Sequence, residues 1–131
     1  MEKFLEVLNK KHVSYKVKGK KIIIGGSLYL EGTAITQLPD NLSVGGSLYL
    51  DDEKIQNIAF RKNCGYSNRT IFAAWIDNTF KIKAGCFLGT IDQFENAVDK
   101  NYSGDAAESY KRSARECIEE LNLKLNSKFD S

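Results

Sequence analysis

The chain contains 131 residues, of which 42% are hydrophobic and 27% are charged, and its formal net charge at pH 7 is +2. This composition is typical of one globular domain or of two small units that share a core, and it excludes a polycation as a whole. No apolar run approaches the ~20 residues that a membrane-spanning helix needs, so we expect no membrane association. Because no secretory leader precedes the first amphipathic stretch, we expect a cytoplasmic location.

The N-terminal stretch, residues 2–11, is predicted to be a short helix because its apolar side chains recur at helical spacing. These side chains are Phe4, Leu5 and Leu8. A helix this short needs a surface to pack on, so we interpret it as a cap on the structure that follows. Residues 15–18 alternate strictly and are predicted to form a strand, with Tyr15 and Val17 facing inward.

The hexapeptide Gly-Gly-Ser-Leu-Tyr-Leu occurs twice, at Gly25–Leu30 and again at Gly45–Leu50. A short fixed period is the signature of a stacked repeat array. Alternate side chains of a strand share one face. One parity therefore predicts a buried stripe, made of Ile22, Ile24, Leu28, Leu30, Leu42, Val44, Leu48 and Leu50. The other parity predicts an outward ladder, in which Ser27 lies over Ser47, Tyr29 over Tyr49 and Glu31 over Asp51.

A third, degraded turn is predicted to follow the second copy. Its residues fall one period after those of the preceding turn: Ile55 after Ile35, Ile58 after Leu38, Cys64 after Val44 and Gly65 after Gly45. The match ends beyond that point, and terminal repeats are expected to be atypical. We interpret this segment as the join between the repeats and a second unit.

The second unit is predicted to begin with a β-hairpin, formed by residues 70–76 and 80–87 around the turn residues 77–79. Its second strand alternates between an apolar face (Phe80, Ile82, Ala84) and a basic face (Lys81, Lys83).

Two helices are expected after the hairpin. Thr90 with Gln93 three positions later is a capping-box pattern, which predicts a helix from Thr90 to about Asn101. A longer amphipathic helix is predicted over residues 106–125. Its apolar face consists of Ala107, Tyr110, Ala114, Cys117, Ile118, Leu121 and Leu125.

These elements predict an α+β fold, in which a short leucine-rich-like β-solenoid with an N-terminal capping helix is followed by a β-hairpin and two helices. We divide the chain into residues 1–66, which hold the capping helix and the repeats, and residues 67–131, which hold the hairpin and the helices. We expect the two units to pack as one compact domain.

The sequence holds few of the groups that catalysis or metal binding requires. The three cysteines, Cys64, Cys86 and Cys117, are odd in number and form no Cys-x-x-Cys pair, so we predict buried free thiols rather than disulfides or a zinc site. Cys86, which precedes a helix, is the sharpest candidate nucleophile, against a role as a small gap-filling residue beside Phe87. Its only available base would be His12, which is interpreted as a structural or surface histidine. We predict no enzyme activity and no cofactor.

Residues 51–53 form the one tight carboxylate cluster, Asp-Asp-Glu. Such a run is typical of a solvated turn, and a divalent cation at a loop edge is the alternative. We predict no metal site here.

The segment Gly25–Leu50 carries a family resemblance. Its two Gly-Gly-Ser-Leu-Tyr-Leu copies and the Leu-Pro-Asp-Asn-Leu at residues 38–42 resemble the short leucine-rich-like repeats of small phage and prophage proteins, in which LP-x-x-L-x-V-G-G-x-L-x-L recurs. Residues 69–89, with Ala-Gly-Cys-Phe at 84–87, resemble a C-terminal unit of such proteins. The resemblance implies a mobile-element protein that acts in a bacterial cell by binding a host or defence protein, as anti-CRISPR proteins do. It brings no catalytic residues.

We therefore predict a non-enzymatic protein that binds a bacterial host protein, with a defence effector as the implied class of partner. The predicted binding residues are Tyr29, Tyr49, Glu31 and Asp51, together with the acidic C-terminal helix, since tyrosine is enriched at interfaces. The alternative for the tyrosines is that they only support each other along the sheet or lie beneath the C-terminal helix.

Nucleic-acid binding through the lysine-rich segment of residues 10–21 is the alternative function. It would use Lys10, Lys11, Lys16, Lys18, Lys20 and Lys21. These lysines are also typical of a solvated helix end and edge strand. We expect a monomer, or a homodimer formed by edge pairing of the repeats.

Overall fold

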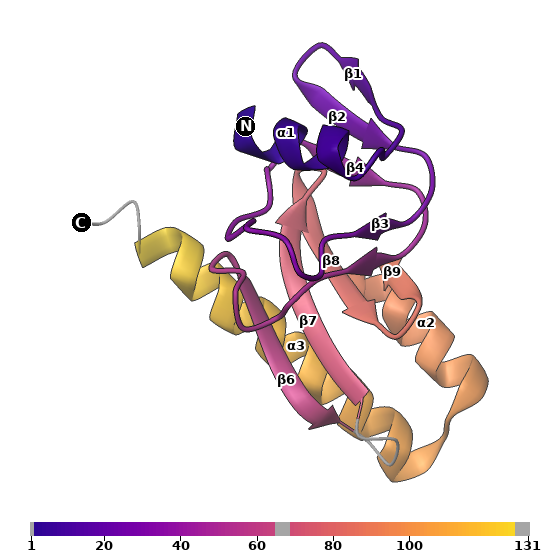
Figure 1. The fold of residues 1–131 in the computed structure, drawn as a ribbon. Helices are drawn as coiled ribbons and strands as arrows, with labels where there is room; N and C mark the ends of the chain where they lie inside the picture. Colours follow the sequence, from indigo (N-terminus) through magenta and orange to yellow (C-terminus); the bar gives the residue numbers. More distant parts are fainter. Residues whose placement is uncertain (1, 65–68, 128–131) are drawn as a thin grey trace.

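The computed structural model describes residues 2–64 and 69–127 (Figure 1). This part of the chain is a mixed α+β structure in which three helices accompany three sheets. In Figure 1 the N-terminal repeats, in indigo and purple, lie against the upper part of a four-stranded sheet, and two helices run along the sheet's other side. The fold therefore has three layers, with the four-stranded sheet in the middle.

The repeats form two small sheets. Their elements are α1 (Glu2–Lys10), β1 (Lys16–Lys18), β2 (Lys21–Ile24), β3 (Leu28–Tyr29), β4 (Leu42–Val44) and β5 (Leu48–Tyr49). β2 pairs in parallel with β4, and β3 pairs in parallel with β5, while β1 runs antiparallel along the outer side of β2. The registers join Ile22 to Leu42 and Leu28 to Leu48, so the two hexapeptides lie side by side as predicted.

The predicted apolar stripe is buried in one core, with Val44 as its exception. Val44 is only half-buried, whereas the other seven residues are inaccessible or nearly so. Phe4 and Leu8 of α1 join the same core. The inward prediction for Val17 is wrong, because its side chain is 51% exposed. β1 is the outermost strand of its sheet, and the core ends beneath β2.

The two copies of the glycine pair differ in their surroundings. A Cβ added to Gly45 would lie 2.4 Å from the carbonyl oxygen of Gly25, and one added to Gly46 would lie 2.6 Å from Ser27 Oγ. A Cβ added to Gly25 or to Gly26 would meet nothing within 4 Å. The second pair is therefore glycine because the turns touch there, with Gly45 N donating to Ile24 O at 2.8 Å.

The third turn stacks on the second only at its start. Gln56 N donates to Thr36 O at 2.7 Å, and these two residues are separated by the same interval as the two hexapeptides. The buried Asn57 side chain accepts from Leu38 N at 2.9 Å and donates to Leu38 O at 2.8 Å. Ile55 and Ile58 are buried, as the repeat pattern requires.

Beyond Ile58 the chain leaves the repeats. Strand β6 (Ile58–Cys64) pairs antiparallel with β7 (Arg69–Ile76), and the register places Cys64 opposite Arg69. The predicted equivalence of Cys64 with Val44 is therefore wrong, because Val44 lies in another sheet. Gly65 and the predicted boundary between residues 66 and 67 fall outside the described residues.

The middle layer is a four-stranded sheet in the order β6-β7-β8-β9, completed by β8 (Thr79–Ala84) and β9 (Phe87–Gly89). The predicted hairpin is present as β7 and β8, but its second strand is shorter than predicted. β8 ends at Ala84, and after a turn at residues 85–86 Phe87 begins β9, which pairs back on β8. The turn residues between β7 and β8, Asp77 and Asn78, have φ values of 54° and 57°, as a tight two-residue hairpin requires. The hairpin is tied to the repeats by an ion pair between Asp77 and Lys21 at 2.8 Å.

Alternate residues of β7 enter different cores. Phe72, Ala74 and Ile76 pack with the repeats, whereas Ile71 and Ala73 pack with the helices α2 (Ile91–Asn101) and α3 (Gly104–Ser127). This alternation follows from the two-residue period of a strand. β7 therefore contributes side chains to both cores and joins the repeats on one side of the sheet to the helices on the other.

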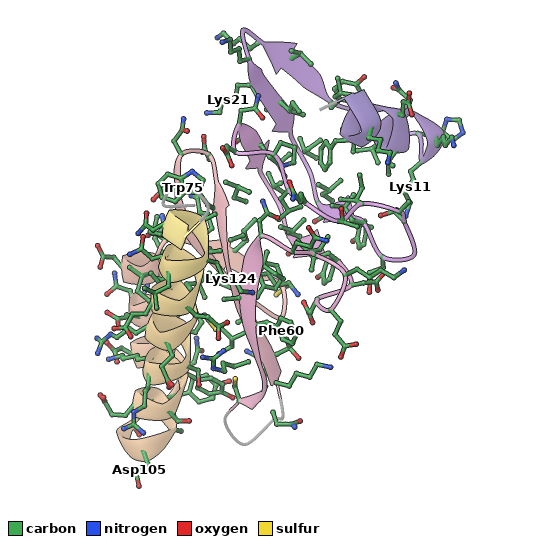
Figure 2. The ribbon with its side chains drawn as sticks, turned by 90° about the vertical axis from the view of Figure 1, so that its left-hand side faces the viewer. Lys11, Lys21, Phe60, Trp75, Asp105 and Lys124 are labelled. Carbon is green, nitrogen blue, oxygen red and sulfur yellow. The ribbon has the colours of Figure 1, made fainter. Side chains whose placement is uncertain are left out.

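Both C-terminal helices agree with the sequence expectations. Thr90 and Gln93 form the capping box at the start of α2. The predicted apolar face of α3 packs on the sheet, with Ala107, Tyr110, Ala114, Cys117 and Leu121 buried. Near its end, Lys124 Nζ donates to Ile58 O at 2.9 Å, and Figure 2 shows Lys124 beside β6. None of the helices in residues 2–64 and 69–127 is long and apolar enough to cross a membrane.

Candidate protein-binding surface

The rings of Tyr29 and Tyr49 are stacked face to face on the outer side of the repeats. Their centroids lie 5.0 Å apart and their planes differ by 7°. The parallel register of β3 with β5 places the two residues directly opposite each other. The predicted ladder is thus present, and we call the surface formed by Tyr29, Tyr49 and Glu31 the tyrosine face.

The stack is closed at one end and open at the other. Lys83 of β8 places its Nζ 4.6 Å from the centroid of the Tyr49 ring, on the side that Tyr29 leaves free. Tyr49 is therefore half-buried between a ring and a cation. Tyr29 is 54% exposed, because its outer face meets no ring or cation among the described residues.

The backbone beside Tyr29 is also open. Leu28 N donates to Ser47 O at 2.8 Å and Leu30 N donates to Tyr49 O at 2.7 Å, so these residues point toward β5. Alternate residues of a strand direct their N–H and C=O to opposite sides, which turns those of Tyr29 away from β5. In the described part of the chain β3 pairs with β5 alone. Its outer edge is thus free to pair.

The acidic residues of the ladder have different roles. Glu31 is exposed in the turn that follows β3. Asp51 is half-buried, and its Oδ2 accepts a hydrogen bond from Gly32 N at 2.9 Å and lies 3.6 Å from Lys54 Nζ. Gly32 has a φ of +74°, a backbone conformation that favours glycine. The hydrogen bond that Gly32 N donates to Asp51 therefore helps to fix the turn after Glu31. Asp51 therefore shapes the tyrosine face more than it contributes a charge to it.

A pocket of about 200 Å³ separates the second repeat from the four-stranded sheet. It is lined by Glu31, Tyr49, Leu50, Asp52, Thr70, Phe72 and Lys83. Partial burial raises the pKa of Asp52, although the positive charge of Lys83 opposes this effect. Partial burial likewise lowers the pKa of Lys83, against the opposing charges of Asp52 and Glu31. Two opposite charges, those of Asp52 and Lys83, thus interact at the inner end of the tyrosine stack.

In comparisons with known proteins, no family model, curated protein or solved structure matches this chain.

Four of the six lysines predicted for nucleic-acid binding lie together on the β1–β2 hairpin and are exposed: Lys16, Lys18, Lys20 and Lys21. The other two lie apart from them, because Lys10 ends α1 and Lys11 follows it. Their register places Lys18 opposite Lys21. Lys21 is already paired with Asp77, and Figure 2 shows it at the outer end of the repeats. The backbone oxygen of Lys20 accepts a hydrogen bond from the Asn41 side chain. The structure thus gathers these lysines in one place, with one of them neutralised.

The cysteines do not all follow the prediction. Cys64 and Cys117 are buried free thiols, as expected, but Cys86 is exposed in the turn between β8 and β9. The gap-filling role predicted for Cys86 is therefore wrong. Its backbone oxygen accepts a hydrogen bond from Ser47 Oγ, which joins the second repeat to this turn. His12 is exposed at the end of α1.

Carboxylates do not converge with other ligands near residues 51–53. Glu53 forms an ion pair with Lys62, and Asp51 is held by Gly32. No group of three or more potential metal ligands occurs in residues 2–64 and 69–127.

Two contributors to the site, Lys83 and Asp52, were not predicted from the sequence. The alternation of β8 placed Lys83 on the face opposite Ile82, but nothing in the sequence showed that this face lies against Tyr49. This contact depends on the packing of β8 against β5, two segments that are distant in the sequence.

Proposed function

We propose that this chain is a non-enzymatic binding module that engages a protein partner through the tyrosine face. The observation that carries this proposal is the stacked pair of rings, closed by Lys83 and open at Tyr29. Tyrosine offers a large contact area with few rotatable bonds, and it is enriched among the residues that dominate binding energy. A ring held in place before binding also loses little conformational entropy.

We further propose that residues 20–58 form a short leucine-rich-like β-solenoid. The recurring interval in backbone pairing supports this assignment, since the interval that separates the first turn from the second also separates Thr36 from Gln56. The resemblance to phage and prophage repeats suggests a bacterial host protein as the partner, with a defence effector as the class it would inhibit.

The proposal is tested by capture of partners from bacterial lysate with wild-type chain and with Tyr29→Ala. The matched control is Val17→Ala, because Val17 is a comparably exposed large apolar side chain on the same repeats. We expect Tyr29→Ala to lose a captured protein that Val17→Ala retains. Trp75 fluorescence on heating would verify that both variants are folded. Equal capture by both variants would refute the proposed surface.

Nucleic-acid binding remains the second candidate, because four exposed lysines lie on one hairpin. Each phosphate that a lysine neutralises releases a counterion, so affinity should fall steeply with salt. A gel-shift salt series on random DNA and RNA, repeated with Lys16→Glu/Lys18→Glu, would detect this mode. Affinity that is unchanged by the reversals would exclude the hairpin as the binding surface.

A further inference from the structure

We infer that a cavity on the helix side of the four-stranded sheet binds a small free carboxylic acid with an apolar body, and that Arg69 pairs with its carboxylate. The cavity is separate from the tyrosine face, because the sheet lies between them. Successive residues of β8 face opposite ways, so Lys83 reaches Tyr49 while Ala84 lies in the core shared with the helices. Binding here is a further activity, beyond the proposed function.

The cavity has a volume of about 480 Å³. Pockets that hold small molecules typically measure about 300–1,000 Å³. The lining comes from β7, β8, β9 and α2 and from the residue that caps the end of α2: Arg69, Ala84, Phe87, Phe94, Val98 and Tyr102. Asn101, which is exposed, also lines the cavity, so solvent reaches it. The position and size of the cavity therefore suit a small ligand that enters from solution.

The apolar walls are in place before a ligand binds. The rings of Phe87 and Phe94 have centroids 5.6 Å apart. Phe87 also packs closely on Gly89, because a Cβ added to Gly89 would lie 2.9 Å from its ring. On the α2 side, Phe94 and Val98 are buried. Side chains that are already fixed lose little conformational entropy on binding, so these walls can hold an apolar group at low cost.

Arg69 brings a positive charge to this apolar site. It is half-buried, and its guanidinium group lies against the β8–β9 turn, since a Cβ added to Gly85 would be 3.7 Å from Arg69 Cζ. The guanidinium group forms no hydrogen bond or ion pair with the residues that the structure describes. Two acids of α2 are paired with α3 instead: Glu95 with Arg115 and Asp99 with Lys111. A partly desolvated cation without a partner favours an anionic ligand.

The charge of the lining favours a carboxylate over a phosphate. Among the described residues that line the cavity, Arg69 is the only charged one. One guanidinium group matches one carboxylate in two-point geometry. A phosphate monoester carries about −1.5 to −2 charges at pH 7, so part of its charge would stay uncompensated beside the aromatic walls.

The polar groups of the lining favour a free acid over the end of a peptide. A peptide would bring main-chain groups that need hydrogen-bond partners when they are buried. Besides Arg69, the described lining offers only the polar side chains of Asn101 and Tyr102. Asn101 Nδ2 already donates to Ala97 O at 2.8 Å. A small acid needs little more than the guanidinium group and the apolar walls.

The test is an NMR titration of the 15N-labelled chain with 3-phenylpropionate and with its neutral amide, 3-phenylpropionamide. We expect the acid to shift the resonances of Ala84, Phe94 and Val98, with a Kd on the order of 1 mM for a ligand of this size. The amide should bind about tenfold more weakly, because it keeps the ring but loses the charge. Phenyl phosphate should bind no more tightly than the acid.

Variants separate the charge from the walls. Arg69→Gln should lower the affinity for the acid to that for the amide and leave the amide unchanged. Arg112→Gln removes the same charge from an exposed position on α3 and should change neither affinity. Ala97→Leu should fill the cavity from α2 and weaken both ligands about tenfold or more, without lowering Tm, since leucine is also a good helix former.

Several results would overturn the inference. These are equal affinity for acid and amide, a preference that survives Arg69→Gln, tighter binding of phenyl phosphate, and the absence of a saturable shift. Acetyl-Gly-Gly-Phe with a free C-terminus tests the peptide alternative, and tighter binding of this peptide than of 3-phenylpropionate would replace the free acid by a peptide end. Shifts that centre on Tyr29 would place the ligand on the other side of the sheet and would equally overturn it. None of these results bears on lysate capture through Tyr29, so the proposed function stands or falls separately.

Discussion

The contact between the two glycine pairs predicts opposite effects of one substitution at equivalent positions. Gly25 and Gly45 begin identical hexapeptides. In Gly45→Ala the new methyl group would be placed 2.4 Å from the Gly25 oxygen. This distance is well below 3.0 Å, and real Cβ atoms essentially never make contacts shorter than that. In Gly25→Ala it would meet nothing within 4 Å.

The cost of Gly45→Ala follows from two terms. Forcing an extra methyl group into a packed site costs about 1–3 kcal/mol, and weakening the bonds from Gly45 N to Ile24 O and from Gly46 N to Gly26 O adds about 1 kcal/mol each. We expect destabilisation by about 3–5 kcal/mol. At about 4 °C per kcal/mol for a chain of this size, Tm should fall by about 12–20 °C. Gly25→Ala should instead be neutral or stabilise by about 0.5 kcal/mol, since it restricts the unfolded chain.

Thermal and urea unfolding, followed by Trp75 fluorescence and far-UV circular dichroism, measure both variants against wild type. Equal melting of the two variants, or a Gly45→Ala protein as stable as wild type, would refute the close stacking of the turns. A Gly26→Ala and Gly46→Ala pair repeats the comparison at the neighbouring position, where the added Cβ of the second copy would lie 2.6 Å from Ser27 Oγ.

Further predictions concern buried polar groups, a helix cap and the thiols. Asn57→Asp should destabilise by about 1–3 kcal/mol in urea unfolding at pH 7 and by less at pH 4, because only a protonated carboxyl can donate to Leu38 O. Thr90→Ala should cost about 1 kcal/mol in the same assay, with Thr90→Ser close to wild type. Cys86 alone should react quickly with Ellman's reagent in the native chain, and a second thiol of equal rate would contradict the observed burial. Burial raises the pKa of the Cys117 thiol from 9.0 to about 12, so the unfolded state ionises first as pH rises. Stability should therefore fall between about pH 9 and 12, and Cys117→Ala should show a smaller fall.

Local pattern was enough to predict the elements whose signals lie within a few residues. The repeat register, the Asp77–Asn78 turn and the capping box of Thr90 each depend on contacts between close or identical segments, and each appears in the structure. Strand β6 was missed because three polar residues, 61–63, interrupt its apolar pattern. Such a strand is recognised only by the β7 neighbour that pairs with it.

The candidate site shows the same division. The ladder of Tyr29 over Tyr49 follows from the repeat, but the difference in exposure between the two rings does not. That difference arises because Lys83 reaches Tyr49 from β8, a strand far along the chain, and Tyr29 has no such neighbour among the described residues. Exposure of Val17 and Cys86 likewise depends on where a layer ends, which no short stretch of sequence encodes.

Strand β7 has a consequence for how the molecule loses its structure. Because its odd- and even-numbered side chains are shared between two separate interiors, detaching it would open both at once. The repeats and the helical layer are therefore not independent modules. If the chain were cut between them, the fragment without β7 would lose the strand that completes its core. Melting should accordingly proceed in one step, with the signals from the repeats and from the helices disappearing at the same temperature.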